Sequence, residues 1–337
     1  MARRRHRDHA AAGVTLLLLL ATALWAYGGF SISNYQRLRM GKDPLYPTKT
    51  DGQHKGAPKP PNHNPLHIPP KVWQIMLPKK QPDGHFSVKA NSLLYTLSWL
   101  ALNPDYTYTL VGPTGGAQFV HRHFANEPKI LAAYNAIPNV GMKSDLLRYL
   151  LLSVEGGVYT DIDTFALRPI ETWVSPSLRD RVRMIVGIEY DQRDEIRWGE
   201  MLHSVQFGQW TIAAAPGHPV FRKMVDRILR SLSELSETYG LPLSQLRPSS
   251  GEVMNVTGPA AWTEVVFQQL QEHEPTLNET KDLSYMTEPT LFGDILVLTI
   301  DGFGMGQRHS NSTNDGTVPE AALVRHLFGG SWRGGRT

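Results

Sequence analysis

The sequence of 337 residues contains no cysteine. Disulfide bonds and thiolate metal sites are therefore excluded. Excess charge is also scarce: the formal net charge is +3, and four arginines, Arg3, Arg4, Arg5 and Arg7, stand at the extreme N-terminus. The remainder has no internal repeat and no long basic stripe with interleaved aromatic residues. We therefore expect no nucleic-acid partner.

The composition is that of a globular protein. Hydrophobic residues make up 41% of the chain and charged residues 19%, which is enough apolar material to bury a core. The length allows one large domain or two small ones. The missing cysteines do not place the chain in the cytosol, because a domain of this size needs no covalent staples.

An uncharged segment, residues 10–30, follows the N-terminal arginines and includes the run Leu16–Leu20. At about 1.5 Å per residue it nearly matches a bilayer core of about 30 Å. Trp25 and Tyr27 lie near its far end. These features predict a transmembrane signal anchor, with residues 1–9 as a cytosolic tail. The alternative is a cleaved signal peptide with an apolar core at residues 14–26.

Residues 31–67 are rich in proline, lysine, asparagine and histidine and show no hydrophobic periodicity. They predict a flexible stem between the membrane and a folded domain at residues 68–337. Three N-glycosylation sequons, at Asn255, Asn278 and Asn311, fit a luminal domain.

From residue 68 onward, strand patterns alternate with helix patterns, which predicts an α/β domain with a mostly parallel central sheet. Strands are expected at residues 72–76, 106–111, 158–160, 184–190, 210–215 and 296–300. Helices are expected from Gly141 to the Gly156-Gly157 pair, and at residues 220–239 and 260–273. Ser87 is expected to cap a further helix reaching Leu102, with Val88, Leu93, Leu94, Leu97 and Leu100 as its buried face.

Two carboxylates, Asp161 and Asp163, follow the strand at residues 158–160. In an extended segment they point to the same side, with Ile162 turned into the core. Hard oxygen ligands of this kind suit Mg²⁺ or Mn²⁺. The bare pattern is also typical of solvated loop carboxylates. With Thr164 it matches the start of haloacid-dehalogenase-type phosphatases, whose nucleophile would be Asp161, although that motif normally ends the first strand of its domain.

Asp145 and Arg148 stand three residues apart on the preceding helix and therefore share a face. They are either a surface ion pair of little energetic value or groups that reach phosphate or sugar oxygens. An arginine can contact such oxygens through two parallel hydrogen bonds.

These residues form one pattern. Ser144, Asp145, Arg148 and Tyr149, followed by Gly156, Gly157, Tyr159, Asp161 and Asp163, resemble the signature of glycosyltransferase family 32. The likeness covers roughly residues 68–332 and is strongest toward the fungal initiation-specific alpha-1,6-mannosyltransferase branch. Trp73 stands where this family often has histidine. The further matching segments are residues 68–74, 189–191, 206–211, 215–219, 257–259 and 326–332.

The resemblance implies a GT-A-type nucleotide-sugar domain that transfers mannose from GDP-mannose to an N-glycan core with retention of configuration. It also implies a divalent metal, most often Mn²⁺, and a type II protein of the Golgi membrane that can form a complex with other mannosyltransferases. Carried over by position, Asp161, Asp163 and His326 would hold the metal. The donor would be bound by Trp73, Gln74, Asp145, Arg148, Tyr149, Asp161, Ser331 and Trp332.

Several alternatives stay open from the sequence. Another family 32 hexosyltransferase, such as a sphingolipid mannosyltransferase, or a non-catalytic sugar-binding subunit of a mannan-building complex, would carry the same pattern. His326 could be an ordinary helix residue. Trp210 and Trp262 could be core residues or sugar platforms. Asp191, Gln209 and Trp210, with Asp194 and Glu195, are candidates for the acceptor side.

Overall fold

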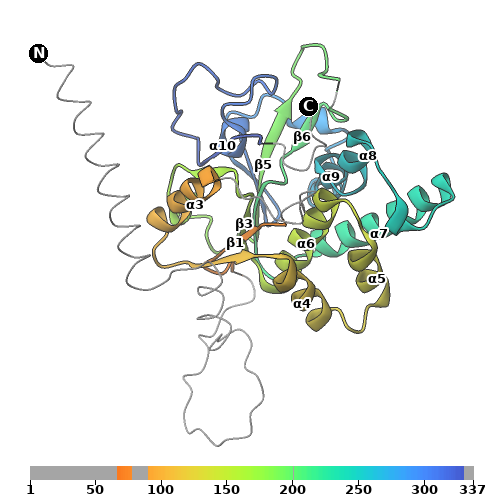
Figure 1. Ribbon diagram of the computed structural model, residues 1–337. Helices are drawn as coiled ribbons and strands as arrows, with labels where there is room; N and C mark the ends of the chain where they lie inside the picture. Colours follow the sequence, from red (N-terminus) through yellow and green to blue (C-terminus); the bar gives the residue numbers. More distant parts are fainter. Residues whose placement is uncertain (1–66, 78–89, 200, 330–337) are drawn as a thin grey trace, which may run out of the picture. The chain divides into compact units, whose positions relative to one another are not determined.

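The computed structural model describes residues 67–77, 90–199 and 201–329 (Figure 1). The predicted cytosolic tail, anchor and stem, the Ser87 cap with Val88, and the candidates Ser331 and Trp332 lie outside these residues. Within the described part of the chain, no helix combines the length and the apolar character needed to cross a bilayer.

A central sheet has the strand order β2-β1-β3-β7-β5-β9-β8, and β6 pairs with β5 off this path. The strands β1 (Lys71–Ile75), β2 (Thr107–Val111), β3 (Gly157–Thr160), β5 (Met184–Asp191) and β9 (Ile295–Leu298) run in one direction. The strands β6 (Val205–Phe207), β7 (Thr211–Ala214) and β8 (Thr290–Phe292) run against them. The prediction of an α/β domain with a mostly parallel sheet is confirmed, with β7 as an antiparallel strand near its centre.

Helices cover both faces of the sheet (Figure 1). One face packs against a group of helices that includes α4 (Pro113–His123), α5 (Pro128–Ala136), α6 (Val140–Glu155), α7 (Pro219–Tyr239), α8 (Ser250–Val256) and α9 (Pro259–His273). The other face packs against α3 (Ala90–Leu102), α10 (Ile300–Gly304) and the small sheet of β4 (Thr164–Ala166) and β10 (Val324–His326). Short 3₁₀ turns lie at Ile170–Thr172, Leu243–Gln245 and Thr280–Leu283. Side chains alternate between the two cores along each strand, as a pleated sheet requires.

The predicted helices that end at Gly156, Tyr239 and His273 are confirmed, as are the predicted strands, with boundaries shifted by a few residues. The short elements were not anticipated. Strands of three residues, such as β4, β6, β8 and β10, leave no period to detect. In α4, Gly115 and Gly116 hide the helix, since glycine disfavours helical structure.

The predicted buried face of α3 is wrong. Leu94, Leu97 and Leu100 are 59%, 55% and 42% exposed, whereas Trp99 is fully buried. The helix lies against β4, and there the indole N–H of Trp99 donates to Thr164 Oγ1 at 3.2 Å. Ser98 Oγ accepts the backbone N–H of Ala166 at 2.9 Å. The face of α3 that satisfies polar groups of β4 therefore turns inward, and the leucines turn outward.

Two glycines with positive φ join α6 to β3, which carries the chain to the candidate metal ligands. Gly156 ends the helix at φ 59°, and Gly157 begins the strand at φ 98°. A Cβ on Gly157 would lie 2.8 Å from the carbonyl oxygen of Lys71 and 3.1 Å from Nε1 of Trp73. Only glycine fits this position without displacing β1.

We expect Gly157→Ala to lower the free energy of unfolding by more than about 2 kcal/mol, because it combines a positive φ with a clash. Gly217→Ala is the matched control: φ there is 71°, and a Cβ would meet no atom within 4 Å. It is expected to cost about 1 kcal/mol. Urea denaturation of both variants measures the difference, and equal losses would show that the close approach to β1 is unimportant.

Candidate active site

Asp161 and Asp163 lie in a tight turn between β3 and β4. The carbonyl oxygen of Asp161 accepts the backbone N–H of Thr164 at 3.2 Å and the Thr164 hydroxyl at 2.6 Å. The chain turns here and is not extended, so Ile162 is only half-buried. The prediction that Ile162 enters the core is therefore wrong. The turn nevertheless keeps the two carboxylates on one side, as predicted.

A histidine from the C-terminal strand completes this group. His326 pairs in register with Thr164 across β10 and β4, and its Nε2 lies 3.3 Å from Oδ1 of Asp163. One ligand atom each from Asp161, Asp163 and His326 lies within 4.8 Å of the others. His326 belongs to a strand, so the alternative of an ordinary helix residue is wrong.

Two carboxylates and an imidazole are a donor set that fits a divalent cation of the Mn²⁺ or Mg²⁺ kind. The His326 ring is held in place by Trp210, which stacks on it with ring centroids 4.5 Å apart. Trp210 is itself fixed because its indole N–H donates to the carbonyl oxygen of Phe303 at 3.1 Å. Trp210 is therefore a buried support for His326.

The two carboxylates have different electrostatic surroundings. Burial raises the pKa of Asp161 despite the nearby Arg148 guanidinium. For Asp163, burial acts in the same direction but is outweighed by hydrogen bonds from His326 and from the backbone N–H of Gly329, which lower its pKa to about 2. Asp163 is therefore ionised at any physiological pH.

Behind the turn lies a buried ion pair on α6. Asp145 and Arg148 are 5% and 4% exposed, so the alternative of a surface ion pair is wrong. The Arg148 guanidinium lies 2.9 Å from Oδ1 of Asp145 and 3.4 Å from Oδ1 of Asp161, and donates to the carbonyl oxygen of Gln209 at 2.8 Å. Burial opposes its charge, but Asp161, Tyr159 and Asp145 outweigh burial, so its pKa is raised.

Asp145 is surrounded by hydrogen-bond donors. Thr257 Oγ1 donates to its Oδ2 at 2.8 Å, and Gln209 Nε2 donates to its Oδ1 at 3.1 Å. Burial nevertheless raises the pKa of Asp145 to about 6, outweighing Arg148 and these donors. Tyr149 supports the same group, since its hydroxyl donates to Gln209 and its ring stacks on Trp262, a core residue.

Two contributors to this network had no role assigned from sequence. The Tyr159 hydroxyl donates to Oδ1 of Asp161 at 2.5 Å, and the Arg148 guanidinium lies over the Tyr159 ring at 4.6 Å. Thr257, 112 residues away from Asp145, supplies its hydroxyl from the end of α8. The sequence did contain a signal for Tyr159. It stands two residues before Asp161, so an extended chain places both side chains on the same side.

Trp73 and Gln74, the predicted nucleotide contacts, lie inside the domain. The indole N–H of Trp73 donates to the carbonyl oxygen of Gly156 at 2.8 Å. Gln74 is fully buried; its Nε2 donates to the carbonyl oxygen of Asp161 at 3.0 Å, and its Oε1 accepts from Thr96 and Tyr108. These contacts make Gln74 an anchor for the turn that carries Asp161 and Asp163.

Asp191 and Asp194, candidates for the acceptor side, stand in the β5–β6 hairpin. Asp191 is buried and accepts from the Ser284 hydroxyl and from the backbone N–H of Tyr285 at 2.9 Å. Asp194 is exposed and accepts from the Tyr285 hydroxyl at 2.5 Å. Asp191 thus fixes the base of the hairpin. Glu195, the residue after Asp194, is exposed as well.

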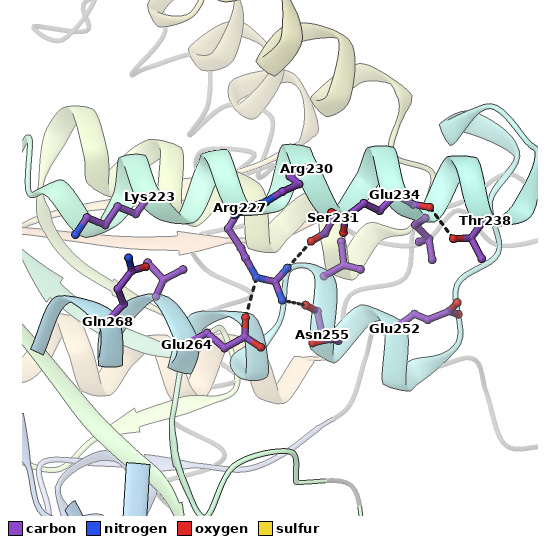
Figure 2. A pocket seen from close by; sticks show the side chains of 13 residues that line it. Lys223, Arg227, Arg230, Ser231, Glu234, Thr238, Glu252, Asn255, Glu264 and Gln268 are labelled. Atoms are coloured by element: carbon purple, nitrogen blue, oxygen red, sulfur yellow. Dashed lines mark hydrogen bonds and ion pairs between the residues drawn. The ribbon is translucent and has the colours of Figure 1, made fainter. Parts of the chain in front are cut away.

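A cavity of about 560 Å³ lies between α7, α8 and α9 (Figure 2). Its central cation, Arg227, donates to Glu264 at 2.9 Å and to the carbonyl oxygen of Asn255 at 3.1 Å. The charge of Arg227 is therefore satisfied by the protein itself. None of the Asp145, Arg148, Asp161, Asp163 and His326 network lines this cavity, so it is not the candidate active site.

Comparison with known proteins finds similarity in the part of the chain that carries this network. The family described as "Glycosyltransferase sugar-binding region containing DXD motif" matches residues 90–179, which include the network from Asp145 to Asp163. The chain is 37% identical over 274 residues to the initiation-specific alpha-1,6-mannosyltransferase of Schizosaccharomyces pombe, covering 79% of this chain and 64% of that protein.

It is 30% identical over 286 residues to the protein of the same name from Candida albicans, covering 79% of this chain and 72% of that protein. The putative glycosyltransferase HOC1 of Saccharomyces cerevisiae is 29% identical over 274 residues, covering 80% of this chain and 66% of that protein. The chain thus spans slightly less than two thirds of the S. pombe protein's length.

Proposed function

This chain belongs to glycosyltransferase family 32, and we propose that it is a metal-dependent mannosyltransferase that uses GDP-mannose and extends an N-glycan core through an alpha-1,6 linkage. The observation that carries the proposal is the connected, largely buried network of Asp145, Arg148, Asp161, Asp163 and His326. The names of the S. pombe and C. albicans relatives support the sugar and the linkage. We further propose that the domain is of the GT-A type and retains configuration.

The charges of the network favour a divalent cation bound together with a diphosphate. Three carboxylates, those of Asp145, Asp161 and Asp163, face one guanidinium, so acidic groups outnumber the cation at the turn. Asp161, Asp163 and His326 would hold the cation, which would neutralise the charge that develops on a departing nucleoside diphosphate. We propose Mn²⁺ as the resident metal, because carboxylate oxygens suit this ion and the resemblance to family 32 implies it.

The other residues either position the turn or offer contacts to the donor sugar. Arg148 lies between the carboxylate of Asp145 and that of Asp161, which favours their ionised forms and fixes their orientation. Asp145 offers a carboxylate that can accept hydrogen bonds from donor sugar hydroxyls. Gln74 and Tyr159 keep the turn and Asp161 in place. Preorganised groups of this kind need no rearrangement during the reaction.

A thermal-shift panel of nucleotide sugars with and without Mn²⁺ tests donor and metal together. GDP-mannose with Mn²⁺ is expected to raise Tm more than UDP-sugars or either component alone, by mass action. The same mixture is expected to release GDP slowly by hydrolysis and faster with an oligomannose acceptor. If no nucleotide sugar shifts Tm or is hydrolysed, the proposal of an active enzyme fails and a non-catalytic sugar-binding subunit is favoured.

Two alternatives are separated by the acceptor and by chemistry. A sphingolipid mannosyltransferase of the same family would transfer to extracted lipid and not to an N-glycan. A haloacid-dehalogenase-type phosphatase is incompatible with the family membership and with the position of the motif after the third strand of the domain.

We also propose that the chain is a single-pass type II protein of the Golgi membrane, anchored by residues 10–30, which can form a complex with other mannosyltransferases. The uncharged segment, the preceding arginines and the sequons support this. Asn255 and Asn278 are exposed, as an N-glycan requires. Mass spectrometry of the mature chain decides between anchor and signal peptide, since a chain that begins near residue 28 would exclude the anchor.

A further inference from the structure

The strand β5 is longer than its neighbours and rises beyond the edge of the sheet where Asp161 and Asp163 lie. Met184 and Ile185 pair with Ala214 and Ala213, which in turn pair with Gly157 and Val158 of β3. Gly187 is thus level with Thr160, the last residue of β3. The remaining part, Ile188–Asp191, extends about 13 Å further at about 3.3 Å per residue. Here β5 pairs with β6, forming a two-stranded ribbon.

The other edge of this ribbon is covered by the segment that follows β9. The helix α10 packs on β5 so closely that a Cβ on Gly304 would lie 2.7 Å from the carbonyl oxygen of Ile188. Further along, the backbone N–H of Asp191 donates to the carbonyl oxygen of Ser310 at 3.2 Å, and Asn311 Nδ2 donates to that of Asp191 at 2.9 Å. The ribbon, α10 and residues 305–313 therefore form one wall.

This wall begins at the candidate metal ligands. Met305 forms a bridge with Arg325, the residue before His326. Trp210, which stacks on His326, donates to the carbonyl oxygen of Phe303 in α10. A molecule bound at the carboxylates would therefore lie against the base of the wall, and an extension of it in the direction of β5 would run along the wall toward its far end.

An aromatic pair stands at the far end, in which Trp198 is exposed and His309 is half-buried. Trp198, in the β5–β6 hairpin, stacks on His309 of the covering segment with ring centroids 4.8 Å apart and an interplanar angle of 19°. Trp198 is 49% exposed, although its backbone N–H donates to the hydroxyl oxygen of the buried Tyr190 at 3.0 Å. Ile196, two residues earlier, is 97% exposed. Large apolar side chains held in place at a surface, without a packing role, are typical of binding surfaces.

We propose that Trp198, supported by His309, is a remote acceptor subsite that binds a sugar of an oligosaccharide whose reacting end lies at Asp161 and Asp163. This inference rests on the proposed function and deepens it, since it defines the acceptor as an extended glycan. The weakly positive C–H groups on one face of a pyranose ring pack against the negative face of an indole. His309 covers one side of the Trp198 indole. The exposed surface of the indole that remains is available to a sugar.

The side chains around the indole favour a glycan over an apolar partner. Asp194, Glu195 and Arg197 flank Ile196 and Trp198 and are exposed. Carboxylates and a guanidinium offer acceptors and donors to sugar hydroxyls, whereas burying them beneath an apolar surface would be unfavourable. The surface also continues directly from the candidate reaction centre, which a separate protein-docking site would not require.

The test compares acceptors of different length. Trp198→Ala is expected to raise KM for a branched oligomannose acceptor about tenfold, the size of effect that loss of one aromatic contact produces. KM for methyl α-mannoside and metal-dependent hydrolysis of the donor are expected to stay unchanged. Trp198→Phe should restore most of the affinity. Tyr239→Ala, which removes an exposed aromatic residue at the end of α7, is the matched control and should change neither value.

Three outcomes overturn the subsite. These are an unchanged KM for the oligosaccharide, an equal change for short and long acceptors, and a change in oligomeric state in place of KM, which would indicate a protein interface. Calorimetric titration of the oligosaccharide gives a readout independent of turnover: wild type should bind about tenfold more tightly than Trp198→Ala. If wild type neither hydrolyses nor transfers but this difference in binding persists, the proposed function fails and the subsite stands.

Discussion

Replacing Asp163 with asparagine is expected to lower sugar transfer by about 10³-fold or more and to abolish its dependence on Mn²⁺. Asp163 is a candidate metal ligand that burial does not neutralise, since hydrogen bonds from His326 and Gly329 lower its pKa to about 2. An amide keeps the shape and still accepts the N–H of Gly329. It removes the charge that a divalent cation requires, so activity should fall much more than stability.

The same substitution makes a prediction about stability. A carboxyl whose pKa falls from 3.8 to about 2 on folding adds stability above pH 4, and this stability is lost as the pH falls from about 4 to 2. The shift corresponds to about 2 kcal/mol. Metal-free Asp163→Asn should therefore be less stable than wild type by about that amount at pH 7, with the difference disappearing near pH 2.

The matched control for this experiment is Asp226→Asn. Asp226 is an exposed carboxylate on α7, paired at the surface with Arg222, and its replacement should leave transfer unchanged. Metal titration by calorimetry and steady-state transfer assays on both variants provide the measurement. Transfer by Asp163→Asn at the wild-type rate with the same Mn²⁺ dependence would contradict the role of the turn as a metal site.

The motif predicted which residues meet, but not the local conformation that brings them together. A period of two places Asp161 and Asp163 on one side of a strand and Ile162 on the other. In the structure the same result comes from a turn, which depends on contacts of Thr164 and of Gln74, 87 residues away from Asp161. Contacts between distant residues are set by packing and leave no local pattern in the sequence.

The error in α3 has a similar origin. Helical periodicity favoured Leu94, Leu97 and Leu100 as the buried face, because it scores apolar character alone. The orientation of the helix is determined by β4, whose backbone N–H at Ala166 and threonine hydroxyl need partners, and these are Ser98 and Trp99. Satisfying buried polar groups outweighed burying three leucines.

Contacts made through short strands and loops were the least predictable part of the structure. His326 was suggested by family resemblance, and its place beside Asp163 comes from pairing between two strands of three residues each. Trp198 and His309 are 111 positions apart in loops without periodicity. Their contact becomes visible only when β5 and the segment after β9 are seen to run along each other.

Replacing Arg148 with methionine is expected to destabilise the protein by about 3–5 kcal/mol and to abolish transfer. The guanidinium lies between the carboxylates of Asp145 and Asp161, and its removal leaves buried negative charge without a partner. Arg148→Lys should recover part of the stability but little activity. A single ammonium group cannot contact both carboxylates and the carbonyl oxygen of Gln209 in the geometry of a guanidinium.

Asp145→Asn separates the effect of this ion pair on stability from its effect on sugar transfer. Burial raises the pKa of Asp145 from 3.8 to about 6, so the folded state binds a proton more tightly than the unfolded state. This preference stabilises the fold below pH 4 and is lost as the pH rises to 6. At pH 7 the ionised carboxylate therefore costs about 3 kcal/mol.

We accordingly expect Asp145→Asn to be at least as stable as wild type at pH 7 while losing most of its transfer activity. Its stability should not fall between pH 4 and pH 6 as that of wild type does. In this background Arg148→Met should cost less than it does alone, because one of the two unpaired carboxylates is gone. The measurement is urea denaturation at pH 4, 5, 6 and 7 of wild type, the two single variants and the double variant, which together form a double-mutant cycle. Additive losses would show that Arg148 and Asp145 are not coupled, and the buried network would then not be the unit that holds the donor site together.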